Sequence, residues 1–446
     1  MSGFAAGLDA TSAFFIFPAV RDGLAGGDAA AASWLLTIVG IVSAAVLLQA
    51  GRLADRFGHN RILVVSSAAA TCGALLAVAA PNLELLVIAK GIQSGALAGI
   101  GVSSIAILVR EAPTTRLATA MGVWAFWTAT SGVVGPILSS ALAETASWRL
   151  VFVAVAAVTT AVTVLAWPGW GDAFPRRDRA GIDWPGTLAA MAGLSLLVLA
   201  LLEGNDWGWS SPRTITGLVV SLGLLGLVVV RSRDHPDPII PLQVFRHRNF
   251  ALSAIIGLVA NIAFFGMWLA LLSYATDVWD RGLIGTGLLL TLMPGTMSVF
   301  ARLSGRLGDA HGVRGVMTTG AIVFSAGFAV VALSVGATER TALLLPAVIA
   351  AGIGMATVLP NATTAGTATL DPVLVGTGTA MIQTCHRVGG SLGSALVVVL
   401  LDAGTVGDPG THRRTLWMIA VVGLLVAALS AGLSESRRSN YGEAGR

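Results

Sequence analysis

Three charged residues lie inside long apolar stretches of the sequence, where a charge is unusual. They are Asp9, Lys90 and Arg387. A carboxylate in apolar surroundings can take up and release a proton, and a neighbouring cation stabilises its charged form. All three residues are therefore candidates for proton coupling. A structural ion pair is the alternative for Asp9 and Lys90, and a structural, substrate or gating role is open for Arg387.

Two of these residues fall at comparable depths in their stretches. Asp9 lies about ten residues before the end of an apolar stretch, and Lys90, the only lysine, lies seven to eight residues into another. At about 1.5 Å per helical residue, the two side chains can reach the same level. His386 precedes Arg387 and either titrates near neutral pH or serves as an ordinary hydrogen-bonding group.

A short glycine- and aspartate-containing motif occurs twice. It reads Gly-Arg-Leu-Ala-Asp-Arg-Phe-Gly at 51–58 and Gly-Arg-Leu-Gly-Asp-Ala-His-Gly at 305–312. Glycine allows a tight turn, and aspartate can accept N–H groups at the N-terminus of a neighbouring helix. The repetition indicates two related halves. The gating candidates in and near this motif are Gly51, Asp55, Arg56, Gly58, Arg110, Gly305, Asp309 and Gly312.

The composition determines where such residues must sit. Of 446 residues, 27 are Lys or Arg and 23 are Asp or Glu, which makes 11% charged against 55% hydrophobic. A soluble domain carries about 25% charged residues. The mean hydropathy of +0.81 excludes a soluble, disordered, collagen-like or nucleic-acid-binding chain. Cys72 and Cys385 both lie in apolar runs, so no disulfide framework is expected. The sequence predicts an integral membrane protein.

Apolar runs long enough to cross a bilayer, about 20 residues each, number fourteen. The first predicted run begins almost at Met1, which fits either a start further upstream or a helix that begins deep in the membrane. The fourteen predicted spans are 3–20, 33–51, 62–80, 83–108, 117–142, 149–168, 185–203, 213–231, 250–272, 283–303, 315–336, 341–362, 375–401 and 415–433.

The arginines orient these spans. With both termini in the cytoplasm, eighteen arginines fall in inner loops and the tail, and seven fall in outer loops. Inner loops of membrane proteins are enriched in basic residues. An even number of spans with cytoplasmic termini is therefore predicted.

Further motifs accompany the repeated turn. Together with it they resemble the major facilitator superfamily, in particular its fourteen-span branch of drug:proton antiporters, over essentially the whole chain. The resemblance rests on Leu8 through Pro18, Lys90-Gly-Ile-Gln93-Ser-Gly95, Gly132-Val-Val-Gly135-Pro136, Trp148-Arg149 and Arg387 through Gly393.

Some positions depart from the pattern of that branch. Lys90 stands where an arginine is usual, and Phe14 stands where an asparagine is usual. Ser139 and Ser140 replace a glycine pair, and Ala310 of the second turn replaces the arginine of the first. These departures weaken any transfer of detailed coupling chemistry to this chain.

The resemblance implies an all-α polytopic membrane protein with the major facilitator fold. We expect a six-helix bundle at 1–170, two linking helices with cytoplasmic loops at 171–249, a second bundle at 250–433 and a cytoplasmic tail at 434–446. The resemblance also implies that Asp55 docks near Gly376-Thr-Gly378 and communicates with Arg110, so that the cytoplasmic side of the transporter closes. Gly132, Gly135 and Pro136 are expected to act in gating or leak prevention, with ordinary helix packing as the alternative.

Aromatic and polar residues of the spans are candidates for the wall of a substrate cavity. Flat rings suit planar or lipophilic compounds, cations included. Most such side chains face lipid or core, so each assignment is individual. The candidates are Gln93, Trp124, Trp127, Asn261, Phe265 and Trp268.

The function that the resemblance implies is export of a lipophilic small molecule in exchange for protons by alternating access. Proton-coupled uptake or facilitated transport of a metabolite by the same fold is the alternative. An enzyme is not favoured, because no His-Glu-x-x-His or P-loop motif occurs. A sensor is not favoured either, because no long loop occurs. We expect no cofactor, no metal and no nucleic acid. A monomer is expected in a plasma membrane, and the 26 arginines to one lysine suggest a bacterial source.

Overall fold

The computed structural model describes residues 1–24, 29–145, 147–171, 183–235, 238, 240–279, 283–336, 341–368, 370–371, 374–402 and 408–434. Every regular element within these ranges is helical. The first six long helices are α1 (Ser2–Leu24), α2 (Ala29–Phe57), α3 (His59–Val78), α4 (Leu83–Glu111), α5 (Leu117–Thr145) and α6 (Arg149–Ala166). Next come α7 (Trp184–Leu202), the short α8 (Gly204–Trp207) and α9 (Pro212–Asp234). The last six are α10 (Arg248–Ser273), α11 (Leu283–His311), α12 (Val313–Ser334), α13 (Thr341–Thr367), α14 (Val375–Asp402) and α15 (Pro409–Ala431).

Twelve helices of the described part of the chain are long and apolar enough to cross a bilayer. They are α2 to α7, α9, α10 and α12 to α15. The two other long helices, α1 and α11, coincide with the predicted spans 3–20 and 283–303. A membrane protein of many helical spans is thus confirmed, and the count of fourteen stays a prediction.

Several helices begin at side chains that satisfy the first backbone N–H groups. Asn82 accepts a hydrogen bond within the first turn of α4, at 3.0 Å, and Ser211 does so in α9, at 3.3 Å. Asp408 accepts two such bonds in α15. Pro212 and Pro409 stand in the first turn, where no N–H is needed. Local sequence signals therefore start these helices.

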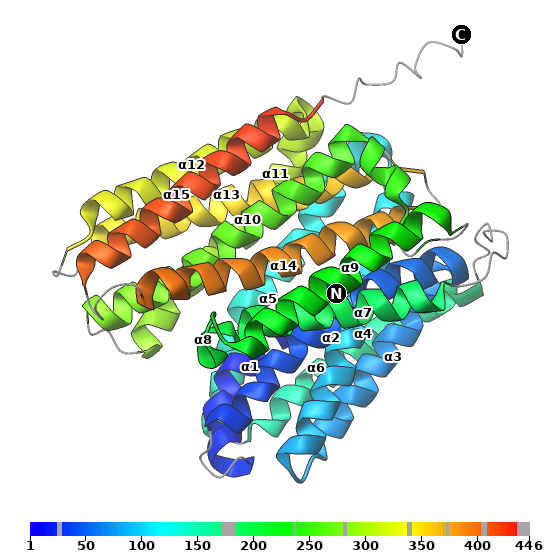
Figure 1. Cartoon of the computed structure of the whole chain (residues 1–446), viewed down its shortest axis with the longest axis horizontal. Helices are drawn as coiled ribbons and strands as arrows, with labels where there is room; N and C mark the ends of the chain where they lie inside the picture. Colours follow the sequence, from blue (N-terminus) through cyan, green and yellow to red (C-terminus); the bar gives the residue numbers. More distant parts are fainter. Residues whose placement is uncertain are drawn as a thin grey trace.

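Helices α1 to α6 and α10 to α15 form two bundles (Figure 1). In the first, α3 packs on α4 and α6, and α1 packs on α5; in the second, α12 packs on α13 and α15, and α10 packs on α14. Small residues permit this closeness. A Cβ on Gly73 of α3 would lie 2.9 Å from the backbone nitrogen of Gln93 on α4. Between the bundles, α2 lies along α14 and α5 lies along α11.

The linking helices lie against one of these two junctions. Helix α7 packs on α2 and also contacts α14, and α9 packs on α7 (Figure 1). Thr37 of α2 donates a hydrogen bond to Glu203 at the end of α7, at 3.1 Å. Gln49 of α2 donates to the Thr187 carbonyl of α7, at 3.3 Å. The α2–α14 junction is therefore covered by α7.

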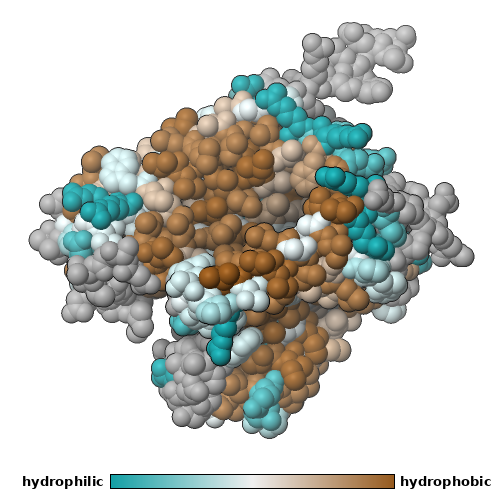
Figure 2. Space-filling model, viewed as in Figure 1, coloured by the Kyte–Doolittle hydropathy of each residue, from teal (hydrophilic) through white to brown (hydrophobic). Residues whose placement is uncertain are grey.

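Apolar side chains cover the outside of the molecule. Hydrophobic surface occupies the middle of the face in Figure 2, and hydrophilic residues gather towards the helix ends. Large apolar side chains such as Val219, Leu222 and Val299 are more than 60% exposed. This distribution suits a lipid environment, where apolar surface is not penalised.

Candidate functional site

A buried ion pair joins α1 to α4. The Lys90 ammonium donates a hydrogen bond to the Asp9 carboxylate, and the side chains are only 1% and 4% exposed. The Lys90 ammonium also lies 5.6 Å from the ring centroid of Phe152 on α6, in a cation–π contact. The expectation that Asp9 and Lys90 reach one depth agrees with this geometry. Each charge depends on the other, because an isolated buried charge is strongly unfavourable.

Small residues position Asp9 by letting α1 approach α5. A Cβ on Gly7 would lie 2.9 Å from the Thr128 carbonyl oxygen of α5. A Cβ on Gly3 would lie 3.2 Å from the Trp124 carbonyl oxygen. Because these glycines repeat every four residues on α1, they form the face that packs on α5.

Arg387 lies near the middle of α14, and its side chain is exposed. Its guanidinium donates no hydrogen bond to any residue that the structure describes, but it interacts electrostatically with Asp9 of the other bundle. Its neighbour His386 packs against Gly257 of α10, and its buried Nε2 has no hydrogen-bond partner among the described residues. Asp9 of α1 and Lys90 of α4 thus form a contact pair, and Arg387 of α14 interacts with Asp9 electrostatically.

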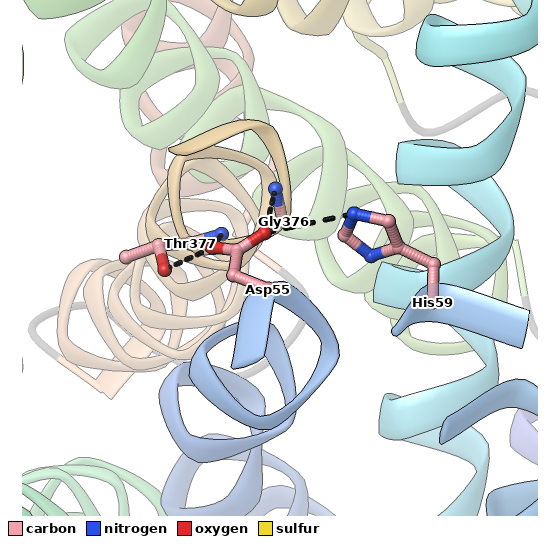
Figure 3. A network of polar contacts seen from close by, with 4 residues as sticks. All are labelled: Asp55, His59, Gly376 and Thr377. Atoms are coloured by element: carbon pink, nitrogen blue, oxygen red, sulfur yellow. Dashed lines mark hydrogen bonds and ion pairs between the residues drawn. The ribbon is translucent and has the colours of Figure 1, made fainter. Parts of the chain in front are cut away.

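The first copy of the repeated motif contacts the other bundle through Asp55 (Figure 3). Its carboxylate accepts hydrogen bonds from the N–H groups of Gly376, at 2.9 Å, and Thr377, at 2.7 Å, and from the Thr377 hydroxyl, at 2.5 Å. These residues form the first turn of α14, whose N–H groups have no partner within the helix. His59 Nε2 lies 3.7 Å from the same carboxylate. We call this set of contacts the Asp55 latch.

The second copy makes the matching contact. Asp309 at the end of α11 accepts hydrogen bonds from the N–H groups of Ala118, at 2.9 Å, and Thr119, at 2.8 Å, in the first turn of α5. The donors of the two latches are 258 residues apart, from 118 to 376 and from 119 to 377. We call this set the Asp309 latch. Both latches lie at the arginine-rich ends of α2 and α11, so both close the same end of the molecule.

The glycines of the motif have two distinct roles. Gly58 and Gly312 have positive φ angles, 101° and 86°, at the turns that follow α2 and α11. Gly51 and Gly305 allow close contact between the bundles. A Cβ on Gly51 would lie 2.6 Å from the Ala380 Cβ, and a Cβ on Gly305 would meet the backbone of α5. Turn and contact both require glycine.

The basic candidates near the latches lie at the same end. Arg56 places its guanidinium 5.8 Å from the ring centroid of Phe57. Arg110 is exposed at the end of α4 and interacts electrostatically with His59. A direct contact between Asp55 and Arg110 is not shown, and the role of both arginines stays a prediction.

The glycine–proline element of α5 faces α11. A Cβ on Gly132 would lie 2.9 Å from the Cβ of Pro294, which interrupts α11. Gly135 is buried. The ring of Pro136 lies outside the described part of the structure. A packing role for Gly132 is therefore visible, and the gating role of the element stays a prediction.

Two of the six substrate-wall candidates, Gln93 and Asn261, are buried by protein, and Trp268 is half-buried. Gln93 is fully buried, and its side-chain amide has no hydrogen-bond partner among the described residues. Asn261 donates to the Gly257 carbonyl within its own helix, at 2.8 Å. Trp268 packs on the core of the second bundle.

The other aromatic candidates differ in environment. Trp124 donates a hydrogen bond from Nε1 to Ser104 of α4, at 3.2 Å. Trp127 is 44% exposed and belongs, with Val123 and Ile137, to a stripe along α5 that faces away from α11. The Trp127 ring contacts the Phe4 ring of α1 edge to face, with 6.4 Å between the ring centroids, and its place in a substrate cavity stays a prediction. Phe265 is 44% exposed and lies against Gly390 of α14, one turn from Arg387.

An apolar pocket of about 500 Å³ lies elsewhere, between α7, α8 and α9, with Trp207 and Arg213 at its wall. Its walls belong to the linking helices alone. It offers no group from either six-helix bundle, so it does not mark the path between them.

Sequence reasoning missed several residues of the site. The expected docking of Asp55 near Gly376-Thr-Gly378 agrees with the contacts of Gly376 and Thr377, whereas the N–H pair of Ala118 and Thr119 that binds Asp309 was not predicted. His59 was not predicted, and its contact with Asp55 follows from a spacing of four residues across the turn. The Asp309 latch could have been found from the repeat: if Asp55 binds the start of α14, then Asp309 should bind the equivalent helix start in the first bundle, which is that of α5.

Comparison with known proteins gives a consistent result. The profile of the Major Facilitator Superfamily matches residues 1–394. The chain is 29% identical to the multidrug resistance protein B homolog of Mycobacterium tuberculosis, over 84% of this chain and 70% of the relative. It is 29% identical to the puromycin resistance protein pur8 of Streptomyces alboniger, over 98% of this chain and 90% of the relative. It is 25% identical to the tetracenomycin C resistance and export protein of Streptomyces glaucescens, over 90% and 74%.

Solved structures show the same architecture. The human organic anion transporter MFSD10 superposes with a TM-score of 0.70 at 13% identity, over 96% of this chain and 98% of that one. The proton:xylose symporter XylE superposes with a TM-score of 0.70 at 12% identity, over 97% of this chain and 94% of that one. At these identities the likeness concerns the fold.

Proposed function

The chain belongs to the Major Facilitator Superfamily, and from this premise we propose that it exports lipophilic small molecules, antibiotics among them, in exchange for protons. Relatives named for multidrug, puromycin and tetracenomycin C resistance support the export direction and the class of compound. Transporters of this kind expose one central site alternately to either side of the membrane.

The observation that carries proton exchange is the buried pair of Asp9 and Lys90. A proton that binds Asp9 removes its charge and leaves Lys90 buried without a counterion. That state is unfavourable, so protonation drives a rearrangement that returns Lys90 to a polar environment. Proton binding and conformational change are coupled in this way.

The two latches support a definite conformational state. Both the Asp55 and the Asp309 latch are engaged. If the arginine-rich ends face the cytoplasm, the inner side is closed and the substrate path opens outward. Asp55, Arg56, Arg110, Asp309 and the motif glycines then control the inner gate. Gly132, Gly135 and Pro136 are assigned to the same gating cycle.

The proposed topology has fourteen spans and two cytoplasmic termini. It adds α1 and α11 to the twelve helices that meet the criterion for a span, because each packs inside its bundle beside such helices. The two bundles occupy 1–170 and 250–433, the linking helices and loops 171–249, and the tail 434–446. The bacterial relatives support a plasma membrane, in which the protein works as a monomer.

Transport by everted membrane vesicles tests the proposal. Vesicles acidified inside should accumulate puromycin or tetracenomycin C, the compounds for which relatives are named, through the wild-type protein. Asp9→Asn should abolish this accumulation, because no carboxylate remains to exchange a proton. Asp206→Asn changes an exposed carboxylate in α8 and should leave it intact.

A double variant separates coupling from folding. Lys90→Gln alone should lower thermal stability, since it leaves Asp9 unpaired. Asp9→Asn combined with Lys90→Gln should restore stability without restoring transport. Proton-driven accumulation by the double variant would contradict the assignment, and accumulation only when the gradient is reversed would indicate uptake.

A further inference from the structure

The three charges that lie within the apolar stretches of the helices do not cancel. Asp9 and Lys90 neutralise each other and are buried together. Arg387 adds a second positive charge, and of the three it alone is exposed. The three charges therefore leave one net positive charge, and that charge is accessible.

The side chain of Arg387 projects towards the first bundle. On a helix, residues seven positions apart share a face. Ala380 lies seven positions before Arg387, and its Cβ faces Gly51 of α2. The electrostatic interaction of Arg387 with Asp9 agrees with this direction. The opposite face of α14 carries Gly389 and Gly393, which pack on α10. Arg387 thus stands between the bundles, on the path that a transported molecule must take.

The neighbours of Arg387 complete a site for an aromatic acid. Gln383 and Ser391 lie one turn before and one turn after it and are partly exposed. Phe265 of α10 presents an exposed ring one turn away, against Gly390. The guanidinium, which lacks a hydrogen-bonded partner in the described structure, has its donors available for a carboxylate. Arginine forms strong, often bidentate hydrogen bonds with such groups.

On the premise of the proposed export function, we propose that Arg387 binds the acidic group of the substrate, with the Phe265 ring against its apolar part. The transporter accordingly prefers lipophilic organic anions to lipophilic cations. A cation would meet the unbalanced charge of Arg387, and Asp9 is already paired with Lys90. The aromatic residues that the sequence suggested for planar or lipophilic compounds, cations included, are thus combined with a positive charge that repels cations.

Three pyrene compounds test this preference with one apolar scaffold. They are 1-pyrenebutyrate, its methyl ester and a pyrenylalkyl trimethylammonium. Binding to the full chain in nanodiscs is measured by energy transfer from tryptophan to pyrene, which needs no transport. The wild-type protein should bind the anion about tenfold or more tightly than the ester, as expected for one hydrogen bond to a charged group, and the cation most weakly.

Substitutions assign this preference to Arg387. Arg387→Gln should remove the advantage of the anion over the ester and change ester affinity less than about twofold. Arg387→Lys should retain most of the advantage, because the charge remains. Arg413→Gln, at an exposed position of α15, should change nothing.

The outcomes separate the two proposals. The role of Arg387 is overturned if the wild-type protein binds the anion and the cation with equal affinity, or if Arg387→Gln lowers the affinity for all three compounds equally. A structural ion pair with Asp9 would produce the second result. Absence of proton-driven movement of any compound in vesicles would instead overturn the proposed function, whatever the binding selectivity.

Discussion

At the residue scale, a few side chains and glycines determine the behaviour of whole helices. Asp55 and Asp309 each use one carboxylate to satisfy two backbone N–H groups of a helix in the other bundle. Such contacts combine a charge-assisted hydrogen bond with the favourable N-terminal end of the helix dipole. These contacts can stabilise the closed end, and because each consists of a few hydrogen bonds to one carboxylate, they can also break when the bundles move apart.

Gly58 offers a test of the turn. Its φ of 101° and ψ of 134° are accessible almost only to glycine. Gly58→Ala should therefore destabilise the protein by about 1 to 3 kcal/mol. Thermal unfolding in detergent should show a lower midpoint than in the wild type.

Gly315→Ala is the matched control for this prediction. Gly315 lies within α12, where an added Cβ meets open space. Alanine favours helix over glycine by about 0.5 to 1 kcal/mol, so stability should be unchanged or slightly raised. If the two variants unfold at the same temperature, the turn does not require glycine.

At the scale of helices, each latch connects the end of one helix to the start of another. Loss of one carboxylate should shift the balance towards the state open at the arginine-rich end. Removing a capping side chain costs about 0.5 to 2 kcal/mol. Asp55→Ala should thus raise the open population by roughly two- to thirtyfold and abolish resistance, while membrane insertion stays normal.

Cysteine labelling measures this shift. Ala380 lies at the α2–α14 contact, so a cysteine there, in a chain without Cys72 and Cys385, should react faster when Asp55 is replaced by alanine. Asp206→Asn serves as the control. Unchanged labelling, or full resistance at normal expression, would rule out the latch.

Helices α7 and α9 are joined by a different carboxylate. Asp183 accepts a hydrogen bond from Arg231 of α9, at 2.6 Å, and one from the Gly186 N–H of α7. Burial opposes the charged form of Asp183, but these hydrogen bonds and the Arg231 charge outweigh it and hold its pKa below the ordinary value of 3.8. The contact therefore stabilises the folded protein above about pH 4 and is lost as the pH falls through the folded-state pKa.

Replacement of Asp183 by asparagine tests this contact. Its melting temperature should lie below that of the wild type at pH 6 to 7, and the difference should shrink as the pH falls below 4. A difference that stays constant down to pH 3 would mean that the charge of Asp183 contributes nothing to stability.

At the scale of the whole molecule, the two junctions between the bundles are unequal. Helix α7 contacts both α2 and α14 and covers their junction, and the helices on which it packs in the described structure include neither α5 nor α11. The latches follow the two-fold repeat, but Asp9 and Lys90 have no counterpart 254 residues on, at Ala263 and Leu344. The proposed gates thus follow the repeat, whereas the charges proposed to drive them occur in the first half alone.

This asymmetry has an electrical consequence for the proposed exchange. If one proton enters for each organic anion that leaves, two charges cross per cycle, against one for a neutral substrate and none for a monovalent cation. An inside-negative potential of 100 mV adds about 2.3 kcal/mol per charge. Export of the anion should respond most steeply to the potential.

Proteoliposomes with a valinomycin-set potassium potential and no pH gradient measure this response. The three pyrene compounds supply the anion, the neutral substrate and the cation. The same dependence on potential for anion and cation would exclude this exchange.

The sequence by itself determined the membrane location, the helical spans and the repeated turn, because these follow from apolar length, basic loops and residue spacing. It also identified Asp9, Lys90, Arg387, Asp55 and Asp309, since charges in or beside a membrane are rare. The sequence also offered Asp9 and Lys90 as a pair, and only the tertiary structure decided the other partners and directions: Asp309 with Ala118 and Thr119, Arg387 towards the first bundle, and Trp127 against Phe4. Spacing fixes the depth of a side chain along its helix. The direction that it faces depends on how glycine and alanine contacts rotate each helix against its neighbours, and these contacts join residues hundreds of positions apart.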